Sequence, residues 1–156
     1  MKNVKRGLIE YIGIEKCPIK NKKNFNQINI EQIVCIPNQK PDMEQINTVS
    51  VKGLVTDYEI VNTPIGSSIE GQIMTGYKLL VCGDIKIKVK YIACEPTQTV
   101  HTAHFCFPFC NYLVLPSDFN PNIKINPSIL IEDIFSDQLD NKCIYNNITI
   151  LLIADI

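Results

Sequence analysis

The sequence lacks the features that define several large classes of protein. Its formal charge is −1, so it has no excess of basic residues for nucleic-acid phosphates, and we expect no nucleic-acid partner. No apolar run approaches the roughly 18 residues of a membrane-spanning helix, so we expect no membrane span. The basic start, residues 1–6, precedes no continuous apolar stretch, which argues against a signal peptide.

The motifs of common enzyme classes are also missing. The chain has no Gly-x-x-x-x-Gly-Lys phosphate loop, no Gly-x-Gly-x-x-Gly turn, no nucleophile elbow and no pair of carboxylates at a catalytic spacing. Glu10, Glu15, Glu31 and Glu44 are interpreted as solvated charges. We therefore expect no enzymatic activity, no catalytic residue and no bound cofactor.

Histidine and cysteine, which are ligands of zinc and copper, gather in residues 101–110 (His-Thr-Ala-His-Phe-Cys-Phe-Pro-Phe-Cys). In an extended strand His104 and Cys106 point to one side and His101 to the other. A proline interrupts the segment before Cys110, so we expect no metal site and interpret His101 as a structural residue. A thiol nucleophile would need a nearby base, and only Cys106 beside His104 offers one, without an oxyanion-hole motif.

Alternation of apolar and polar residues is the strongest structural signal, and it predicts strands. In residues 85–91 apolar residues alternate with Lys86, Lys88 and Lys90, which we expect to be exposed. Strands recur about every dozen residues with proline or glycine between them, without a helical period or a long repeat. We predict an all-β fold, an antiparallel β-sandwich or flattened barrel with a short N-terminal arm. The residues predicted to be buried in two of its strands are Ile85, Ile87, Val89, Tyr91, Ile148, Ile150 and Leu152.

The N-terminal arm is predicted from one apolar segment followed by a polar one. We assign residues 1–24 to the arm and its lysine- and asparagine-rich linker, and residues 25–156 to the β domain. Such a segment is able to add a strand to the sheet of a neighbouring subunit, so we expect a homo-oligomer joined by the arm. An arm folded back onto its own domain is the alternative. The arm residues proposed to make the contact are Leu8, Ile9, Tyr11, Ile12 and Ile14.

The chain has seven cysteines, an odd number, so they cannot all pair within one chain. We expect at least one disulfide between subunits, and Cys17, in the polar arm, is the first candidate. Cys35 and Cys106 are interpreted as small buried thiols. Seven reduced thiols are the alternative. The candidates for bonds between subunits are Cys17, Cys82, Cys94, Cys110 and Cys143.

Several segments in a fixed order resemble the SPOCS domain family, which is named for spore coat proteins of clostridia. The resemblance begins in a Lys-Pro-Asp-(apolar)-Glu-Gln-Ile segment, continues through a valine-histidine strand and a Pro-Phe corner, and covers roughly residues 28–156. The abundance of lysine, isoleucine and asparagine fits an AT-rich genome of this kind. The segments that carry the resemblance are residues 40–46 (Lys-Pro-Asp-Met-Glu-Gln-Ile), 76–81 (Gly-Tyr-Lys-Leu-Leu-Val), 89–93 (Val-Lys-Tyr-Ile-Ala), 99–101, 107–109 and 113–116.

The resemblance implies a structural role at the spore surface, in the coat, the exosporium or an appendage. It implies synthesis in the mother-cell cytoplasm and oxidation after that cell lyses, so that disulfides cross-link the assembled protein. The expected partners are other copies of the chain and other spore-coat proteins. The alternative is a monomeric β-sandwich that docks another spore-coat protein or a cell-wall polysaccharide.

Overall fold

The computed structural model describes residues 2–15 and 24–155, and all regular structure in them is β. The all-β prediction is therefore confirmed. No helix in these residues is long and apolar enough to span a membrane. The strands are β1 (Lys2–Arg6), β2 (Ile9–Ile14), β3 (Phe25–Cys35), β4 (Met43–Ser67), β5 (Ile73–Ala93), β6 (Val100–Val114), β7 (Asn126–Gln138) and β8 (Cys143–Asp155).

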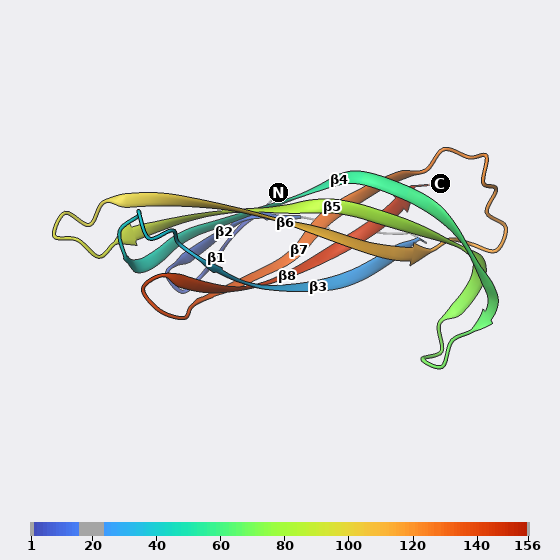
Figure 1. Ribbon diagram of the computed structural model, residues 1–156, viewed down its shortest axis with the longest axis horizontal. Helices are drawn as coiled ribbons and strands as arrows, with labels where there is room; N and C mark the ends of the chain where they lie inside the picture. Colours follow the sequence, from blue (N-terminus) through green and yellow to red (C-terminus); the bar gives the residue numbers. More distant parts are fainter. Residues whose placement is uncertain (1, 16–23, 156) are drawn as a thin grey trace.

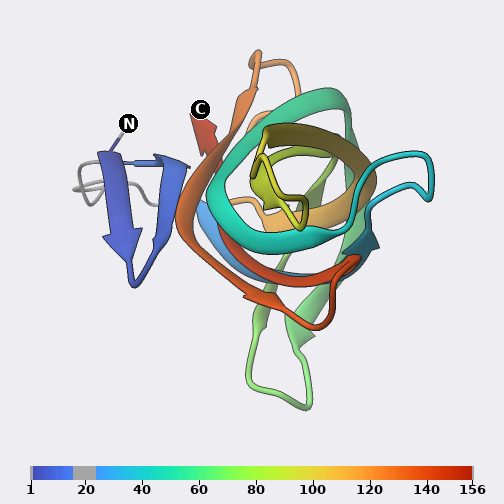
Figure 2. The same ribbon diagram turned by 90° about the vertical axis from the view of Figure 1, so that its left-hand side faces the viewer.

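The strands form one mixed sheet that curls around its own core. Their order is β3-β8-β7-β2-β4-β5-β6, with β1 paired to β2. Strands run along the length of the molecule (Figure 1), and the end view shows the sheet wrapping round on itself (Figure 2). The edge strands β3 and β6 approach each other where the Asn26 side chain donates to the carbonyl oxygen of Tyr112, at 2.7 Å. No ladder joins these edges in the described part of the chain.

The core lies between the inner faces of this curled sheet, and the predicted alternation fills it. In β5 every second residue from Leu79 to Tyr91 faces inward, and the apolar residues among them are at most 1% exposed. Lys86, Lys88 and Lys90 lie on the outer face and are exposed. In β8, Ile148, Ile150 and Leu152 are fully buried. Both strands therefore match the prediction, because a period of two places one whole set of side chains on the buried face.

Strand β2 departs from the expected antiparallel arrangement. It runs parallel to β4, from Glu10 opposite Thr48 to Ile12 opposite Ser50, and meets β7 where Ile14 lies opposite Ile131. The other ladders of the described residues are antiparallel. In the strand order β2 is the connection between β3-β8-β7 and β4-β5-β6.

A glycine permits the close contact between β2 and β4. Gly13 has a φ of +115°, and a Cβ atom there would lie 2.1 Å from the carbonyl oxygen of Val51. A larger residue would therefore strain the backbone and push β2 away from its neighbour.

Residues 2–15, assigned from the sequence to a separate arm, are thus part of the same sheet as the β domain. Most of the predicted linker, residues 16–23, lies outside the described residues.

Candidate functional site

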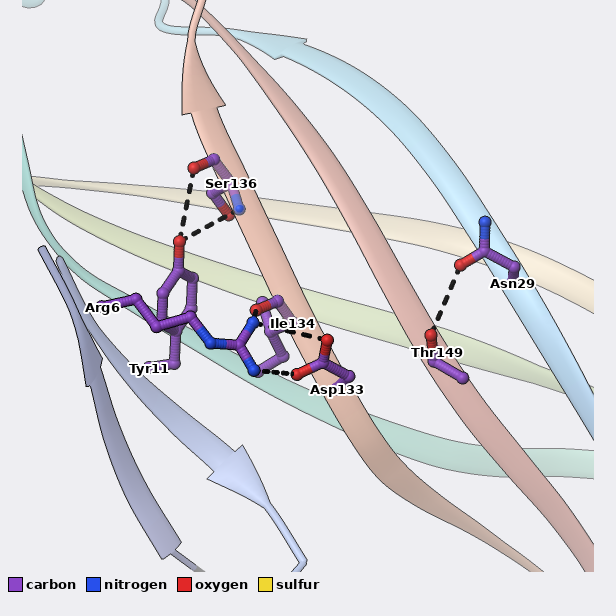
Figure 3. A network of polar contacts seen from close by, with 7 residues as sticks. All are labelled: Arg6, Tyr11, Asn29, Asp133, Ile134, Ser136 and Thr149. Carbon is purple, nitrogen blue, oxygen red and sulfur yellow. Dashed lines mark hydrogen bonds and ion pairs between the residues drawn. The ribbon is translucent and has the colours of Figure 1, made fainter.

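The N-terminal hairpin is fastened to β7 by a polar network (Figure 3). The Arg6 guanidinium lies 2.5 Å from an Asp133 carboxylate oxygen and donates to the carbonyl oxygen of Ile134 at 3.0 Å. The hydrogen bond with Asp133 raises the pKa of Arg6. The Tyr11 hydroxyl accepts from the Ser136 N–H at 3.1 Å and donates to the Ser136 carbonyl oxygen at 3.3 Å. Since Arg6 and Asp133 are both nearly half exposed, the buried Tyr11 is the main anchor.

The residues proposed as an assembly arm therefore contribute to the core of their own chain. Tyr11 and Ile14 are only 2% and 6% exposed and belong to the core cluster. Ile9 and Ile12 are half-buried, and Leu8 is exposed in the turn between β1 and β2. The structure matches the alternative stated for the arm, a segment folded back onto its own domain, because β2 lies between β7 and β4 in the sheet of its own chain.

Four cysteines form two disulfides within the chain. Cys35 pairs with Cys143 across β3 and β8, and Cys82 pairs with Cys110 across β5 and β6. Each pair lies directly opposite in its antiparallel ladder, with Cα atoms 4.0 Å and 4.1 Å apart.

These pairs correct four expectations for the cysteines. Cys82, Cys110 and Cys143 were candidates for bonds between subunits, and Cys35 was interpreted as a buried thiol; all four are paired inside one chain. The physical reason is register, since facing cysteines on adjacent strands need no movement of the backbone to bond. Which residues face each other depends on pairings distant in sequence, and no local signal gives them.

Cys94 and Cys106 are unpaired and exposed. Cys94 follows β5, and its N–H donates to the carbonyl oxygen of Asp42 at 2.8 Å. Cys106 was expected to be buried, but Phe105 and Phe107 on either side of it pack against the core, so alternation places its thiol outside. Cys94 keeps its place as a candidate for a bond between subunits. Cys17 lies outside the described residues.

The histidines lie as the alternation predicts. His101 is half-buried and stacks on Tyr91, with ring centroids 5.8 Å apart, whereas His104 is exposed with Cys106. The buried Tyr91 hydroxyl donates to the carbonyl oxygen of Pro41 at 3.2 Å, and burial raises the pKa of Tyr91. Among the described residues, no group of three or more histidine, cysteine or acidic side chains is arranged to hold a metal ion.

The outer face of β4, β5 and β6 carries a lysine patch, which we define as Lys52, Lys86, Lys88 and Lys90. Cross-strand pairing aligns Lys52, Lys86 and Cys106 in one row. The next row holds Ser50, Lys88 and His104. A shallow pocket of about 280 Å³ lies over these two rows.

The far end of the β4–β5 hairpin projects from the body and exposes apolar side chains. In both views this end, green in the figures, bends away from the rest of the sheet (Figures 1 and 2). The last hydrogen bonds between this end and the body join Thr75 and Tyr77 to Leu115. Beyond them Ile65 is 84% exposed, Ile73 is 72% exposed and Ile69 is fully exposed. We call these three residues the hairpin tip.

Part of the hairpin tip continues the inward-facing series of β5. Ile73 lies an even number of residues before Leu79 and Ile85 on the same strand. Its side chain would therefore face the core if the body extended this far. Ile65 lies opposite Thr75 and therefore on the same face. Nothing in the described part of the chain covers this face. This exposed face could not be predicted from the sequence, because the length of β4 and the extent of the body are tertiary properties.

Comparison with known proteins identifies one family. Residues 42–139, more than half of the chain, match the family model described as "SipL, SPOCS domain". The match includes the whole of β4, β5, β6 and β7. No curated protein and no solved structure matches the chain. The matched residues contain most of the segments on which the resemblance rested, and the chain belongs to the SPOCS domain family.

Proposed function

We propose that the protein is a structural component of the spore surface that assembles with other copies of itself, and that it has no enzymatic role. Membership of the SPOCS domain family suggests a role related to sporulation. The finer statement, assembly in the coat, the exosporium or an appendage after synthesis in the mother-cell cytoplasm, is what the resemblance to this family implies, and the surface of the domain supports only the assembly. Two features of that surface bear on it, the hairpin tip and the unpaired thiols.

The hairpin tip is the observation that carries the proposal. Ile65, Ile69 and Ile73 are largely or fully exposed on one projecting element. Burying an isoleucine side chain contributes about 1.5–3 kcal/mol, so a partner that covered all three would gain several kilocalories per mole. Exposed apolar side chains gathered on one element are typical of interaction sites in soluble proteins. A second copy is the partner we favour, because the proposed self-assembly requires repeated contacts between identical units.

Disulfide chemistry supports a second, later step. Two disulfides link neighbouring strands within each chain, and disulfides persist in oxidising surroundings. Cys94 and Cys106 remain exposed, and Cys17 is a further thiol in the sequence. A bond between two copies through one of these thiols would make dissociation depend on reduction as well as on loss of contacts.

The test compares the assembly state of matched variants. Purified wild-type protein should form oligomers or polymers, seen by light scattering and negative-stain electron microscopy. The triple variant Ile65→Ser/Ile69→Ser/Ile73→Ser should be a folded monomer. The control Leu8→Ser/Val100→Ser removes exposed apolar residues from other places, 68% and 62% exposed, and should assemble like the wild type.

Two results would contradict the proposal. Wild-type protein that stays monomeric at every concentration would favour the alternative, a binding module for another spore-coat protein or a cell-wall polysaccharide. A triple variant that assembles normally would remove the hairpin tip from the interface. Non-reducing electrophoresis of assembled, thiol-blocked protein tests the later step: the ladder of linked species should disappear in a Cys17→Ser/Cys94→Ser/Cys106→Ser variant.

A further inference from the structure

The two unpaired thiols of the described residues have opposite electrostatic surroundings. Cys106 lies directly across from Lys86. Adjacent strands are about 4.8 Å apart, and next-but-one residues along a strand about 7 Å. Lys52, Lys86 and Lys88 therefore bring three ammonium groups within reach of the thiol, beside His104 in the next row. Within the described residues none of these lysines has an ion-pair partner.

Cys94, by contrast, has acidic residues around it. Glu95 follows it in the chain and is exposed. The Asp42 backbone contacts the Cys94 N–H, and the exposed Glu44 lies on β4 next to Met43, which pairs with Ala93. Lys142 neutralises part of this charge through its ion pair with Asp42, at 2.8 Å.

We propose that Cys106 and the lysines around it form a modification site that selects anionic disulfides. A carboxylate-bearing organic disulfide binds in the pocket, with its carboxylates at Lys52, Lys86 and Lys88. The pocket, about 280 Å³ in volume, accommodates one half of a small organic disulfide, and its open side leaves room for the departing half.

The chemical step is thiol–disulfide exchange. The Cys106 thiol gives its proton to solvent, and the thiolate attacks one sulfur of the disulfide. A bond forms between that sulfur and Sγ of Cys106, the original S–S bond breaks, and the other half leaves as a thiolate. Cys106 is oxidised and the small disulfide is the oxidant, so no further reactant is needed. This proposal does not depend on self-assembly.

The expected selectivity follows from the charges. A lysine about 7 Å from an anion in water raises its local concentration about two- to threefold, so three lysines give roughly tenfold at low salt. Asp84 lies one row beyond Lys86 on the same face and opposes part of this effect. In 0.5 M NaCl the screening length falls to ~4 Å, and most of the preference should disappear.

The experiment uses Cys94 as an internal standard. Protein with Cys17→Ser is treated with glutathione disulfide (anionic), bis(2-hydroxyethyl) disulfide (neutral) or cystamine (cationic), and the modified fractions of Cys94 and Cys106 are followed by peptide mass spectrometry. The ratio of the Cys106 rate to the Cys94 rate cancels the intrinsic reactivity of each reagent. This ratio should be about tenfold higher for the anionic reagent than for the neutral one, and lower for the cationic one.

Variants at the lysines give the control. Lys86→Gln/Lys88→Gln should lower the anionic preference about fivefold, whereas Lys78→Gln should leave it unchanged. Lys78 lies on the same strand, but its ammonium group is held over the Tyr112 ring at 3.9 Å, far from the pocket. The proposal is overturned if the rate ratio is the same for all three reagents, if 0.5 M NaCl has no effect on it, or if Cys106 reacts with none of them. The three-reagent comparison needs no lysine variant, so it tests the selectivity of Cys106 even where a variant fails to fold.

Discussion

Replacement of Tyr11 by alanine should destabilise the whole domain, because β2 connects the two parts of the sheet. Tyr11 is 2% exposed in the core, and its hydroxyl bonds both backbone groups of Ser136 on β7. Its own strand pairs with β4 on the other side. A side chain in this position supports contacts to both parts at once, although it lies only eleven residues from the start of the sequence.

The magnitude follows from these contacts. Removing a large aromatic side chain from a core costs about 3–5 kcal/mol. Leaving the Ser136 N–H without its partner adds about 1–3 kcal/mol if water does not replace it. The total approaches the stability of an ordinary domain, about 5–15 kcal/mol. Tyr11→Phe keeps the ring and loses only the hydroxyl, so it should cost about 1–3 kcal/mol, the part that comes from the unpaired Ser136 N–H.

The assay is urea unfolding followed by far-UV circular dichroism, without reductant so that both disulfides stay intact. The control is Leu8→Ala, a change in the same hairpin at a residue that is 68% exposed, which should alter stability by less than about 0.5 kcal/mol. Each protein is measured at two concentrations tenfold apart. Equal stability of Tyr11→Ala and Leu8→Ala would refute the buried position of β2. A midpoint that rises with protein concentration would instead show that folding is coupled to association between chains.

Two further predictions concern the disulfides and alkaline pH. Replacing both cysteines of the Cys35–Cys143 pair by serine should lower the thermal midpoint more than replacing both cysteines of the Cys82–Cys110 pair. The two pairs have sequence separations of 108 and 28 residues, for which the chain-entropy model gives a stabilisation of about 5 and about 4 kcal/mol. Burial raises the pKa of Tyr91, so the folded state favours the protonated hydroxyl. The stability that the protonated Tyr91 contributes is fully present below the unfolded-state pKa of about 10. It is lost as the pH rises through the folded-state pKa. Wild-type protein should therefore lose more stability than Tyr91→Phe between about pH 9 and 11; parallel pH profiles of the two unfolding midpoints would contradict this.

Period-two alternation predicted the interior strands because it is a local property. Ile85, Ile87 and Val89 face the core for the same reason that the lysines between them face solvent. The opposite directions of His101 and His104 came from the same rule. Each of these statements needs only the direction of a side chain within one strand.

Features that depend on neighbours in the sheet were not predictable in this way. The parallel insertion of β2 and the partner of Cys35 depend on pairings far apart in sequence. Gly53 lies in register opposite Ile85. A Cβ atom there would lie 2.5 Å from the Ile129 side chain, so the glycine makes room for packing across the core. The sequence alone does not show that Ile129 is nearby.

The positions of the two disulfides bear on where copies of the chain can meet. β3 and β6 end the main strand order of the sheet, β1 is a further strand that pairs with β2, and each disulfide joins β3 or β6 to its inner neighbour. A disulfide resists separation of the edge strand from its neighbour, and a hydrogen bond between Asn26 and Tyr112 joins the two edges. Both arrangements reduce the opportunity for another chain to add a strand at β3 or β6. Contacts between copies are therefore expected to use side chains that project from the body, and the hairpin tip is the most exposed apolar group of that kind among the described residues.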